Sequence, residues 1–295
     1  MTELTDGLAL PLAGLLGLMV GSFLNVVVHR LPLMLERRWQ EDCAAVAAES
    51  PGSAGAVAPA QAEHDAPFNL STPRSRCPHC GHQIRWYENV PLLSWIMLRA
   101  RCSACKAKIS ARYPAVELVN GLLFAYCAWR WGVSNPQAWA WSGFSAALLC
   151  LTLIDWDTTL LPDDITLPLL WAGLVIAVPG YGEVSISDAV VGAAAGYTSL
   201  WAVYWGFRLL TGKEGMGYGD FKLFAALGAW LGWQGLLPVI LCASVVGAVV
   251  GIALKLQKRL REGGYVPFGP FLALGGLLTM ALGNAWVNRL LGLPM

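Results

Sequence analysis

The sequence contains few charged residues. Asp, Glu, Lys and Arg make up 13% of its 295 residues, about half the proportion found in ordinary soluble domains. Hydrophobic residues make up 56%. A chain of this composition cannot enclose all of its apolar surface in one soluble core. The composition therefore excludes a water-soluble single domain and predicts an α-helical protein that crosses a membrane several times.

The chain also lacks an excess of charge of either sign. Its 20 basic residues are balanced by 19 acidic ones, for a net charge of +1. This balance excludes the overall positive charge that is typical of a nucleic-acid-binding protein. The residues before the first apolar run include no Lys or Arg, so the run lacks the basic segment of a cleaved signal peptide. We expect it to be retained as a membrane anchor.

Stretches with almost no charged residues predict where the chain crosses the bilayer, because a hydrocarbon core about 30 Å thick requires roughly 20 apolar residues in a helix. One stretch, Leu223–Leu254, has 32 residues and is too long for one ordinary span. Gly232-Trp-Gln-Gly235 near its middle predicts a turn between two shorter helices. The remaining stretches are about Leu8–Val28, Val116–Trp131, Ala138–Ile154, Ile165–Pro179, Ala189–Phe207 and Gly263–Asn288.

The distribution of Lys and Arg supports this turn. With it, the chain has eight spans, and 18 basic residues lie on one side, in Arg30–Arg112, Arg208–Lys222 and Lys255–Arg261. Without the turn, the 20 Lys and Arg residues divide into 15 on one side of the membrane and 5 on the other. Because cytoplasmic segments are enriched in Lys and Arg, we predict a polytopic protein of about eight transmembrane helices. Its N-terminus lies outside and its basic side faces the cytoplasm.

The large soluble segment lies between the first and second predicted spans. We predict three parts: residues 1–29 as the first transmembrane helix, residues 30–113 as a cytoplasmic domain, and residues 114–295 as a membrane domain of seven helices. Within the cytoplasmic domain, residues 43–67 are rich in Ala, Pro and Ser. This composition predicts a flexible insert or a frayed helix with no chemical role.

Four of the eight cysteines form two pairs in the cytoplasmic segment. Cys77-Pro-His-Cys80 and Cys102-Ser-Ala-Cys105 are separated by 21 residues, a spacing typical of a zinc ribbon, in which each turn directs two thiolates at one ion. The cytoplasm keeps thiols reduced, which argues against disulfides. We therefore predict a structural Zn²⁺ held by Cys77, Cys80, Cys102 and Cys105. The alternatives are two redox-active pairs or four unligated thiols.

Three other features have simple interpretations. His79 and His82 lie beside the cysteine pairs, but four thiolates already complete a zinc site, so we expect both at the surface. Cys127, Cys150 and Cys242 fall in predicted spans, where we expect them to be buried as small apolar side chains. Glu117 at the start of the second span is interpreted as an interface residue, the alternative being a buried polar network.

Acidic residues gather at the predicted cytoplasmic ends of two spans. Asp155, Asp157, Asp163 and Asp164 lie at the end of the third span and in the loop that follows, and Asp220 lies in Gly217-Tyr-Gly-Asp220 at the start of the sixth. An ionisable residue beside a span suggests a functional site. The predicted topology places both groups on the same side of the membrane.

Two carboxylates that lie close together in a partly dry site share a proton. The ionised one takes a proton from a water that attacks a peptide carbonyl, and the protonated one donates to the carbonyl oxygen. The spacing alone does not choose Asp155 over Asp157 or Asp163. A proton- or cation-coupled transporter would also place carboxylates near broken helices. Acids at a span end are also common as solvated interface residues, and Asp163 or Asp164 would then cap the helix that begins near Ile165.

Several motifs, in order along almost the whole chain, resemble those of the type IV prepilin peptidases. Residues 21–32, GSFLNVVVHRLP, resemble the opening motif of that family, and the cysteine pairs match its cytoplasmic domain, which is followed by residues 112–117, RYPAVE. The two acidic segments, at Asp155 and at residues 215–222, GMGYGDFK, resemble its two catalytic boxes. Residues 267–271, PFGPF, resemble its closing motif.

The resemblance implies a GxGD-type intramembrane aspartic protease in the bacterial inner membrane, with Asp155 and Asp220 as the catalytic pair. Such an enzyme removes the short basic leader from type IV prepilins and type II secretion pseudopilins at the cytoplasmic face. The acidic segment Asp155–Asp164 would then attract leader Lys and Arg. Family members with the cysteine domain also methylate the new N-terminal amine with S-adenosylmethionine, an activity for which the resemblance identifies no residues here.

One segment departs from the family pattern. Family members often have Gly-Gly or a similar small pair before the third cysteine, where this chain has Arg99-Ala-Arg101. Two other functional classes remain open at this point. One is the coupled transporter, in which Asp155 and Asp220 would serve ion coupling. The other is a zinc-ribbon scaffold of a secretion machine, for which both acids would be dispensable.

Overall fold

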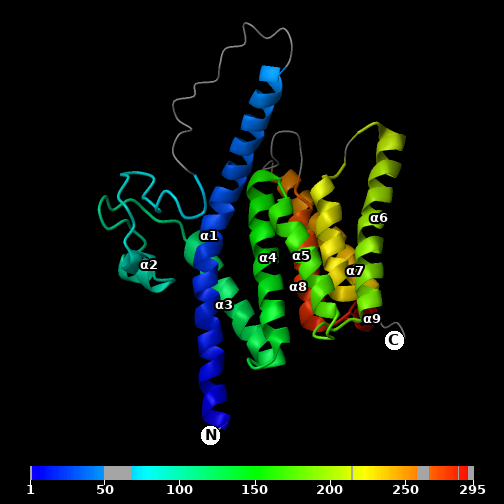
Figure 1. The fold of residues 1–295 in the computed structure, drawn as a ribbon, viewed down its shortest axis with the longest axis horizontal. Coiled ribbons are helices and arrows are strands. Elements are labelled where there is room, and N and C mark those ends of the chain that lie inside the picture. Colours follow the sequence, from blue (N-terminus) through cyan, green and yellow to red (C-terminus); the bar gives the residue numbers. More distant parts are fainter. Residues whose placement is uncertain (1, 50–67, 214, 258–265, 285, 292–295) are drawn as a thin grey trace. The chain divides into compact units, whose positions relative to one another are not determined.

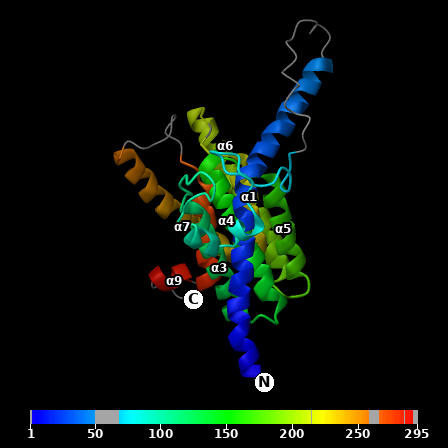
Figure 2. The ribbon, with the colours of Figure 1, turned by 90° about the vertical axis from the view of Figure 1, so that its left-hand side faces the viewer.

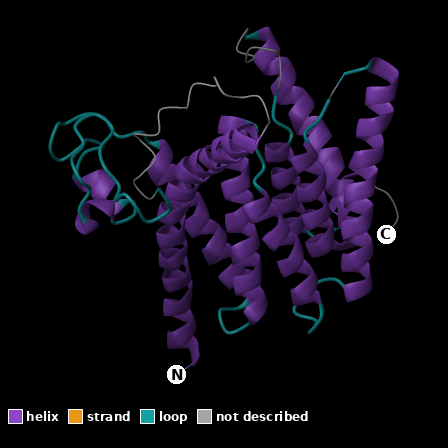
Figure 3. Ribbon diagram, turned by 45° about the horizontal axis from the view of Figure 1, so that its top comes forward, coloured by secondary structure: helices purple, strands orange, loops and turns teal. Residues whose placement is uncertain are grey.

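A computed structural model describes residues 2–49, 68–213, 215–257, 266–284 and 286–291. The chain divides into two compact units, one of residues 11–125 and one of residues 1–10 with 126–295. Helices make up most of the described residues, as the composition predicts, and the described residues 68–111 are mainly loop (Figure 3). The predicted domain boundaries at residues 29 and 113 remain predictions.

The unit of residues 11–125 contains most of α1 (Thr2–Glu49), the short helices η2 (Trp86–Asn89) and α2 (Leu93–Met97), and the greater part of α3 (Arg112–Trp131). Within it, α1 and α3 pack closely (Figure 2). A Cβ on Gly17 would lie 2.7 Å from the Cβ of Phe124, and one on Gly21 would lie 2.8 Å from the Cα of Glu117. Small residues therefore allow the two backbones to approach, as in many membrane helix pairs.

Polar side chains strengthen this helix pair. Asn120 is fully buried, and its Nδ2 donates to the carbonyl oxygen of Gly17 at 2.7 Å. Glu117 is also buried, with 8% of its surface exposed, and its Oε2 accepts from the backbone N–H of Leu92 at 2.9 Å. Our interpretation of Glu117 as an interface residue is therefore wrong. The carboxylate turns inward because it satisfies a backbone donor of the loop that folds over α3.

Helix α1 continues well beyond the predicted span. The first part of the Ala-rich insert, residues 43–49, completes this helix, and residues 50–67 lie outside the described residues. Arg30 of α1, whose side chain is buried, holds the segment that begins at residue 68 against this helix. Its guanidinium donates to the carbonyl oxygens of Asn69 at 2.8 Å and Pro73 at 2.6 Å.

The second unit is a helical bundle (Figure 1). The predicted spans of this part of the chain that lie before residue 257 correspond to helices whose ends differ by a few residues. The last predicted span, Gly263–Asn288, is wrong in extent, because Gly269–Leu282 forms one helix and Trp286–Leu291 forms a separate short one after Gly283. Helix α7 contacts α5, α6 and α8, and its side chains form the centre of the core. The helices are α4 (Pro136–Thr158), α5 (Asp163–Ala177), α6 (Ile186–Thr211), α7 (Tyr218–Leu256), α8 (Gly269–Leu282) and α9 (Trp286–Leu291).

Helix α7 is broken at Gly232, as predicted. Gly232 has φ 73° and ψ 172°, values that no residue adopts within a helix. Leu227 and Val239, on either side of the break, contact the neighbouring residues Gly276 and Gly275 of α8. In a straight helix, Leu227 and Val239 would lie about 18 Å apart along the axis. The chain therefore doubles back at Gly232 into two antiparallel segments.

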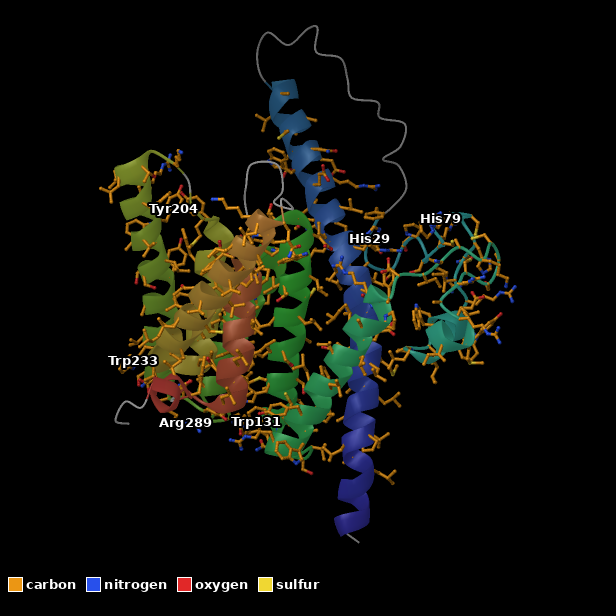
Figure 4. All side chains as sticks on the ribbon, turned by 180° about the vertical axis from the view of Figure 1, so that it is seen from behind. His29, His79, Trp131, Tyr204, Trp233 and Arg289 are labelled. Atoms are coloured by element: carbon orange, nitrogen blue, oxygen red, sulfur yellow. The ribbon has the colours of Figure 1, made fainter. Side chains whose placement is uncertain are left out.

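Within the described residues, three helical segments are long and apolar enough to cross a bilayer, namely Leu8–Ala47, Pro136–Thr158 and Tyr218–Leu256, the last of which contains the break at Gly232. Gly269–Leu282 is a shorter apolar helix. Figure 4 labels Trp131, Trp233 and Arg289 at one end of the bundle and Tyr204 towards the other. Because Trp is enriched at membrane–water interfaces, this arrangement is typical of an integral membrane protein.

Candidate active site and metal centre

Asp155 is positioned by the end of α4. The helix begins at Pro136, with Asn135 as its N-cap, and stops at Thr159, which has left-handed backbone angles. Asp155 lies in the last turn, one turn before this stop, and only 4% of its surface is exposed. A carboxylate is thus held just inside the end of an apolar helix.

Asp220 is positioned by the start of α7. It lies in the first turn of that helix, and 4% of its surface is exposed. Aromatic packing holds this end of α7 against α6: the ring of Tyr204 lies 5.6 Å from that of Phe221 and 5.3 Å from that of Tyr218, centroid to centroid. Tyr204 appears on α6 in Figure 4. These contacts flank Asp220 on both sides in the sequence.

The two carboxylates meet at the same end of the bundle. Leu161, in the loop after α4, contacts a residue beside each of them: a Cβ on Gly219 would be 2.7 Å from the Leu161 Cβ, and one on Gly269 would be 3.1 Å from its Cδ1. Gly219 adjoins Asp220, and Gly269 lies against Asp155. Residues beside both acids therefore meet the same leucine, at the end where α4 stops and α7 begins. The structure thus brings together two acids that are 65 residues apart in the sequence.

Burial distinguishes Asp155 from its acidic neighbours. Asp157, Asp163 and Asp164 are all exposed. Asp163 pairs with Lys222, whose Nζ lies 2.6 Å from its Oδ2. Among the described residues of the bundle, Asp155 and Asp220 are the buried carboxylates, a distinction that the sequence spacing did not make.

The capping interpretation of Asp163 and Asp164 is wrong. Helix α5 begins at Asp163 itself, and its N-cap residue is Pro162, which makes no side-chain cap. Both acids therefore lie in the first turn, where a negative charge is favoured by the helix dipole. The ion pair of Asp163 with Lys222 joins the start of α5 to the start of α7.

Gly269 is a site residue that the sequence reasoning missed. It is the first residue of α8, and a Cβ built on it would lie 2.5 Å from Asp155 Oδ2. Any side chain at this position would displace the carboxylate. The sequence placed Gly269 in a motif by resemblance but assigned it no role, because its proximity to Asp155 depends on how α8 packs against α4.

This arrangement suits acid–base chemistry on a polar bond. Two carboxylates that are both withdrawn from water, and close to each other, are not readily ionised together, so one proton is shared between them. One group then accepts a proton while the other donates one. Exposed acids would be ionised at neutral pH and could not divide these roles.

The four paired cysteines also meet, within the unit of residues 11–125. Their sulfur atoms all lie within 4.8 Å of one another. Cys77 Sγ is 3.8 Å from Cys105 Sγ, and Cys80 Sγ is 4.0 Å from Cys102 Sγ. A tetrahedral Zn²⁺ with Zn–S bonds of about 2.3 Å requires sulfur atoms about 3.8 Å apart. The four thiols therefore fit a single metal ion.

The two cysteine turns have the same backbone pattern. The N–H of Cys77 donates to the carbonyl oxygen of His82, and the N–H of Cys102 donates to that of Ala107, both over five residues. The residue after the second cysteine of each pair, Gly81 or Lys106, has a positive φ. Because of this turn, the two sulfur atoms of each cysteine pair face the same point, where the two pairs meet.

The electrostatics of the cluster favour a bound cation. Backbone N–H groups of His79 and Cys80 lower the pKa of the Cys77 thiol to about 7, which favours the thiolate that binds metals. The pKa of Cys80 is raised to about 11: the backbone N–H of His82 lowers it, but desolvation and the neighbouring thiols outweigh that effect. Four thiolates at this distance therefore require a positive charge between them.

Glu88 joins the two cysteine turns. Its Oε2 accepts from the backbone N–H of Arg85 at 2.9 Å and lies 3.3 Å from His82 Nε2. The hydrogen bonds from Arg85 and the Ser103 side chain lower the pKa of Glu88 to about 2, so the carboxylate is ionised at neutral pH. His79 is exposed, as expected, whereas His82 is half-buried by this contact. Cys127, Cys150 and Cys242 are buried, as expected.

Comparison with known protein families matches most of the chain. Residues 15–131 match the family described as the bacterial peptidase A24 N-terminal domain, and residues 142–252 match the type IV leader peptidase family. The first match includes the four cysteines, and the second includes both buried aspartates.

Curated relatives are similar over nearly their whole length. A prepilin leader peptidase/N-methyltransferase of Aeromonas hydrophila is 50% identical over 292 residues, which cover 97% of this chain and 96% of the relative. Proteins with the same description from Stutzerimonas stutzeri and Pseudomonas aeruginosa are 52% and 49% identical, over 91% and 92% of this chain and 89% of each relative. No solved structure matches the chain.

Proposed function

Because the chain belongs to the family of prepilin leader peptidase/N-methyltransferases, we propose that Asp155 and Asp220 are the two residues with which it hydrolyses the leader peptide bond. The protein cleaves the leader from type IV prepilins. The observation that supports this dyad is that, among the described residues of the bundle, these two are the buried carboxylates and lie at the same end of it.

The proposed reaction needs only these side chains and a water molecule. The ionised carboxylate takes a proton from the water, whose oxygen then bonds to the carbonyl carbon of the scissile peptide. The protonated carboxyl group donates its proton to the carbonyl oxygen. When the C–N bond breaks, the protonated carboxyl group gives its proton to the departing amine. One hydroxyl of the tetrahedral intermediate gives its proton to the other carboxylate as the new carbonyl forms, so the pair again shares one proton.

A matched set of variants tests the dyad. We expect Asp155→Asn and Asp220→Asn each to abolish cleavage of a prepilin by the purified protein, because either change removes the shared proton. Asp157→Asn, assayed at saturating prepilin so that a change in KM has no effect on the rate, is the control, since Asp157 lies on the same helix and is exposed. Cleavage by either dyad variant at the rate of the original protein would refute the proposal. Solute uptake by proteoliposomes without cleavage would instead support the transporter.

The second activity is methyl transfer to the new N-terminus. The names of the relatives include this activity, and we infer that the methyl donor is S-adenosylmethionine and that pseudopilins of type II secretion are substrates as well. The test supplies labelled S-adenosylmethionine together with a substrate whose leader has already been removed. Transfer of label by Asp155→Asn would show that the two activities use different residues, and no transfer by the original protein would refute the inference.

We also propose that Cys77, Cys80, Cys102 and Cys105 hold a structural Zn²⁺. Four thiolates leave no open coordination position, so the metal would stabilise the cysteine domain and take no part in hydrolysis. We expect one zinc per chain by elemental analysis. Cys105→Ser should lose it and lower the melting temperature, whereas Cys43→Ser, at an exposed cysteine outside the cluster, should not. Full zinc content in Cys105→Ser would refute the site.

For the membrane arrangement, we propose eight transmembrane helices in the bacterial inner membrane. The break at Gly232 and the excess of Lys and Arg on one side support it. The N-terminus would lie outside, and both Asp155 and the cysteine domain on the cytoplasmic side. Labelling of single cysteines with an impermeant thiol reagent in intact cells tests this: a cysteine placed at Trp233 should react, and one placed at Asp157 should not.

A further inference from the structure

A groove about 410 Å³ in volume runs along the bundle between α4 and α5, and we propose that it binds the apolar helix of the prepilin that follows the cleavage site. This inference rests on the proposed function and adds a substrate-binding surface to it. The proposed ligand of the groove is the apolar segment of the substrate, with a basic residue at the end nearer the dyad.

The wall formed by α4 combines Trp139 with a row of small residues. Ala140, Gly143 and Ala147 line the groove at successive turns of the helix. A Cβ on Gly143 would meet no atom within 4 Å, so the groove is open at this point. Small side chains in a row allow another helix to approach closely in a membrane, where packing rather than exclusion of water drives helix association.

The floor and the opposite wall are rigid and apolar. Trp230 of α7 and Phe144 of α4 form the floor, with ring centroids 4.9 Å apart. The position of Trp230 is fixed by a hydrogen bond, because its Nε1 donates to the carbonyl oxygen of Leu169 of α5 at 2.8 Å. The lining residues of α5, from Asp164 to Ile176, extend about 18 Å along that helix. A bound helix of about 12 residues has the same length.

The acidic end of the groove identifies the occupant. Asp164 lines that end and is exposed. Its neighbour Asp163 pairs with Lys222, two residues after Asp220, so the acidic end of the groove is the end nearer the dyad. A ligand that fits must be apolar along its length and positively charged there. A prepilin has this order of basic leader and apolar helix, whereas the phosphate of a phospholipid would be repelled by Asp164.

Filling the groove tests the inference, with a matched control. Gly143→Phe places a bulky side chain in the open groove. Gly206→Phe changes an exposed glycine of α6 that also has no atom within 4 Å of its Cβ position. We expect Gly143→Phe to raise the KM for prepilin at least tenfold with kcat within twofold, and Gly206→Phe to leave both unchanged. An unchanged KM in Gly143→Phe, or equal effects of the two substitutions, would overturn the inference.

Photocrosslinking makes the test independent of catalysis and of folding of the bulky variant. Benzoylphenylalanine is placed at Ala147 in the Asp155→Asn protein and, as the control, at Gly206. We expect prepilin adducts from position 147 only, mapped to the first 12 residues after the cleavage site. Adducts with lipid or with a second copy of the chain alone would overturn the inference. Cleavage by Asp155→Asn would refute the dyad and leave the crosslinking result as the test of the groove.

Discussion

Replacing Gly269 by alanine should remove peptidase activity through a single methyl group. The added Cβ would lie 2.5 Å from Asp155 Oδ2, whereas ordinary contacts begin near 3.4 Å. The carboxylate must therefore move by about 0.9 Å. Displacement of a reacting group by about 1 Å reduces a rate by about 100-fold, which corresponds to about 2.7 kcal/mol of transition-state stabilisation. We expect kcat for prepilin cleavage to fall by that factor and the KM to change little.

A second glycine on the same helix separates this effect from simple crowding. A Cβ on Gly276 would lie 2.6 Å from Leu227 Cδ2, so Gly276→Ala crowds α8 to the same degree, but against a leucine of the core. Overpacking of this kind destabilises a protein by about 1–3 kcal/mol. Both variants should therefore melt at a lower temperature than the original protein, and Gly269→Ala alone should lose kcat.

The assay measures prepilin cleavage at saturating substrate, thermal melting, and methylation of a substrate without a leader. Methylation by Gly269→Ala at the original rate would show that the rest of the molecule is intact. The reasoning is refuted if Gly269→Ala cleaves prepilin within twofold of the original kcat, or if Gly276→Ala loses as much activity. Either result would mean that the position of the Asp155 carboxylate does not limit the reaction.

Three further predictions concern residues outside the dyad. Ala100 has a left-handed backbone with φ 58°. Ala100→Gly should therefore stabilise the cysteine domain by about 0.5–1 kcal/mol in denaturant unfolding, because relief of this strain exceeds the entropy that glycine adds to the unfolded chain. A lower stability of the variant would contradict this prediction. Asp157→Asn with Asp164→Asn should raise the KM for prepilin by weakening attraction of the basic leader, most strongly at low ionic strength, and an unchanged KM would reject that attraction. Glu88→Gln should lower the melting temperature at pH 7, because the ionised carboxylate that accepts from the backbone N–H of Arg85 is lost. Equal melting temperatures of the variant and the original protein would show that this contact does not stabilise the fold.

Local sequence was sufficient to predict the long helices and the cysteine cluster. The apolar runs predicted helices α4 to α8 because the bilayer imposes a length and a composition on every span, but they did not predict the separate short helix α9. The break in α7 was predictable because Gly232 is followed by a polar residue and a second glycine in a run too long for one helix. The cysteine cluster was predictable because each pair is contained in one turn, whose geometry is local.

The tertiary structure decided which acidic and polar side chains are buried. Asp155 and Asp157 are two residues apart and chemically identical, and only the packing of α4 against α8 turns the first inward and leaves the second exposed. The contact of Gly269 with Asp155, the inward position of Glu117 and the groove beside Asp164 likewise arise between segments distant in the sequence. Composition and spacing are properties of one segment, whereas burial is a property of the segments that pack around it, and so the chemistry of a carboxylate is decided only when the helices assemble.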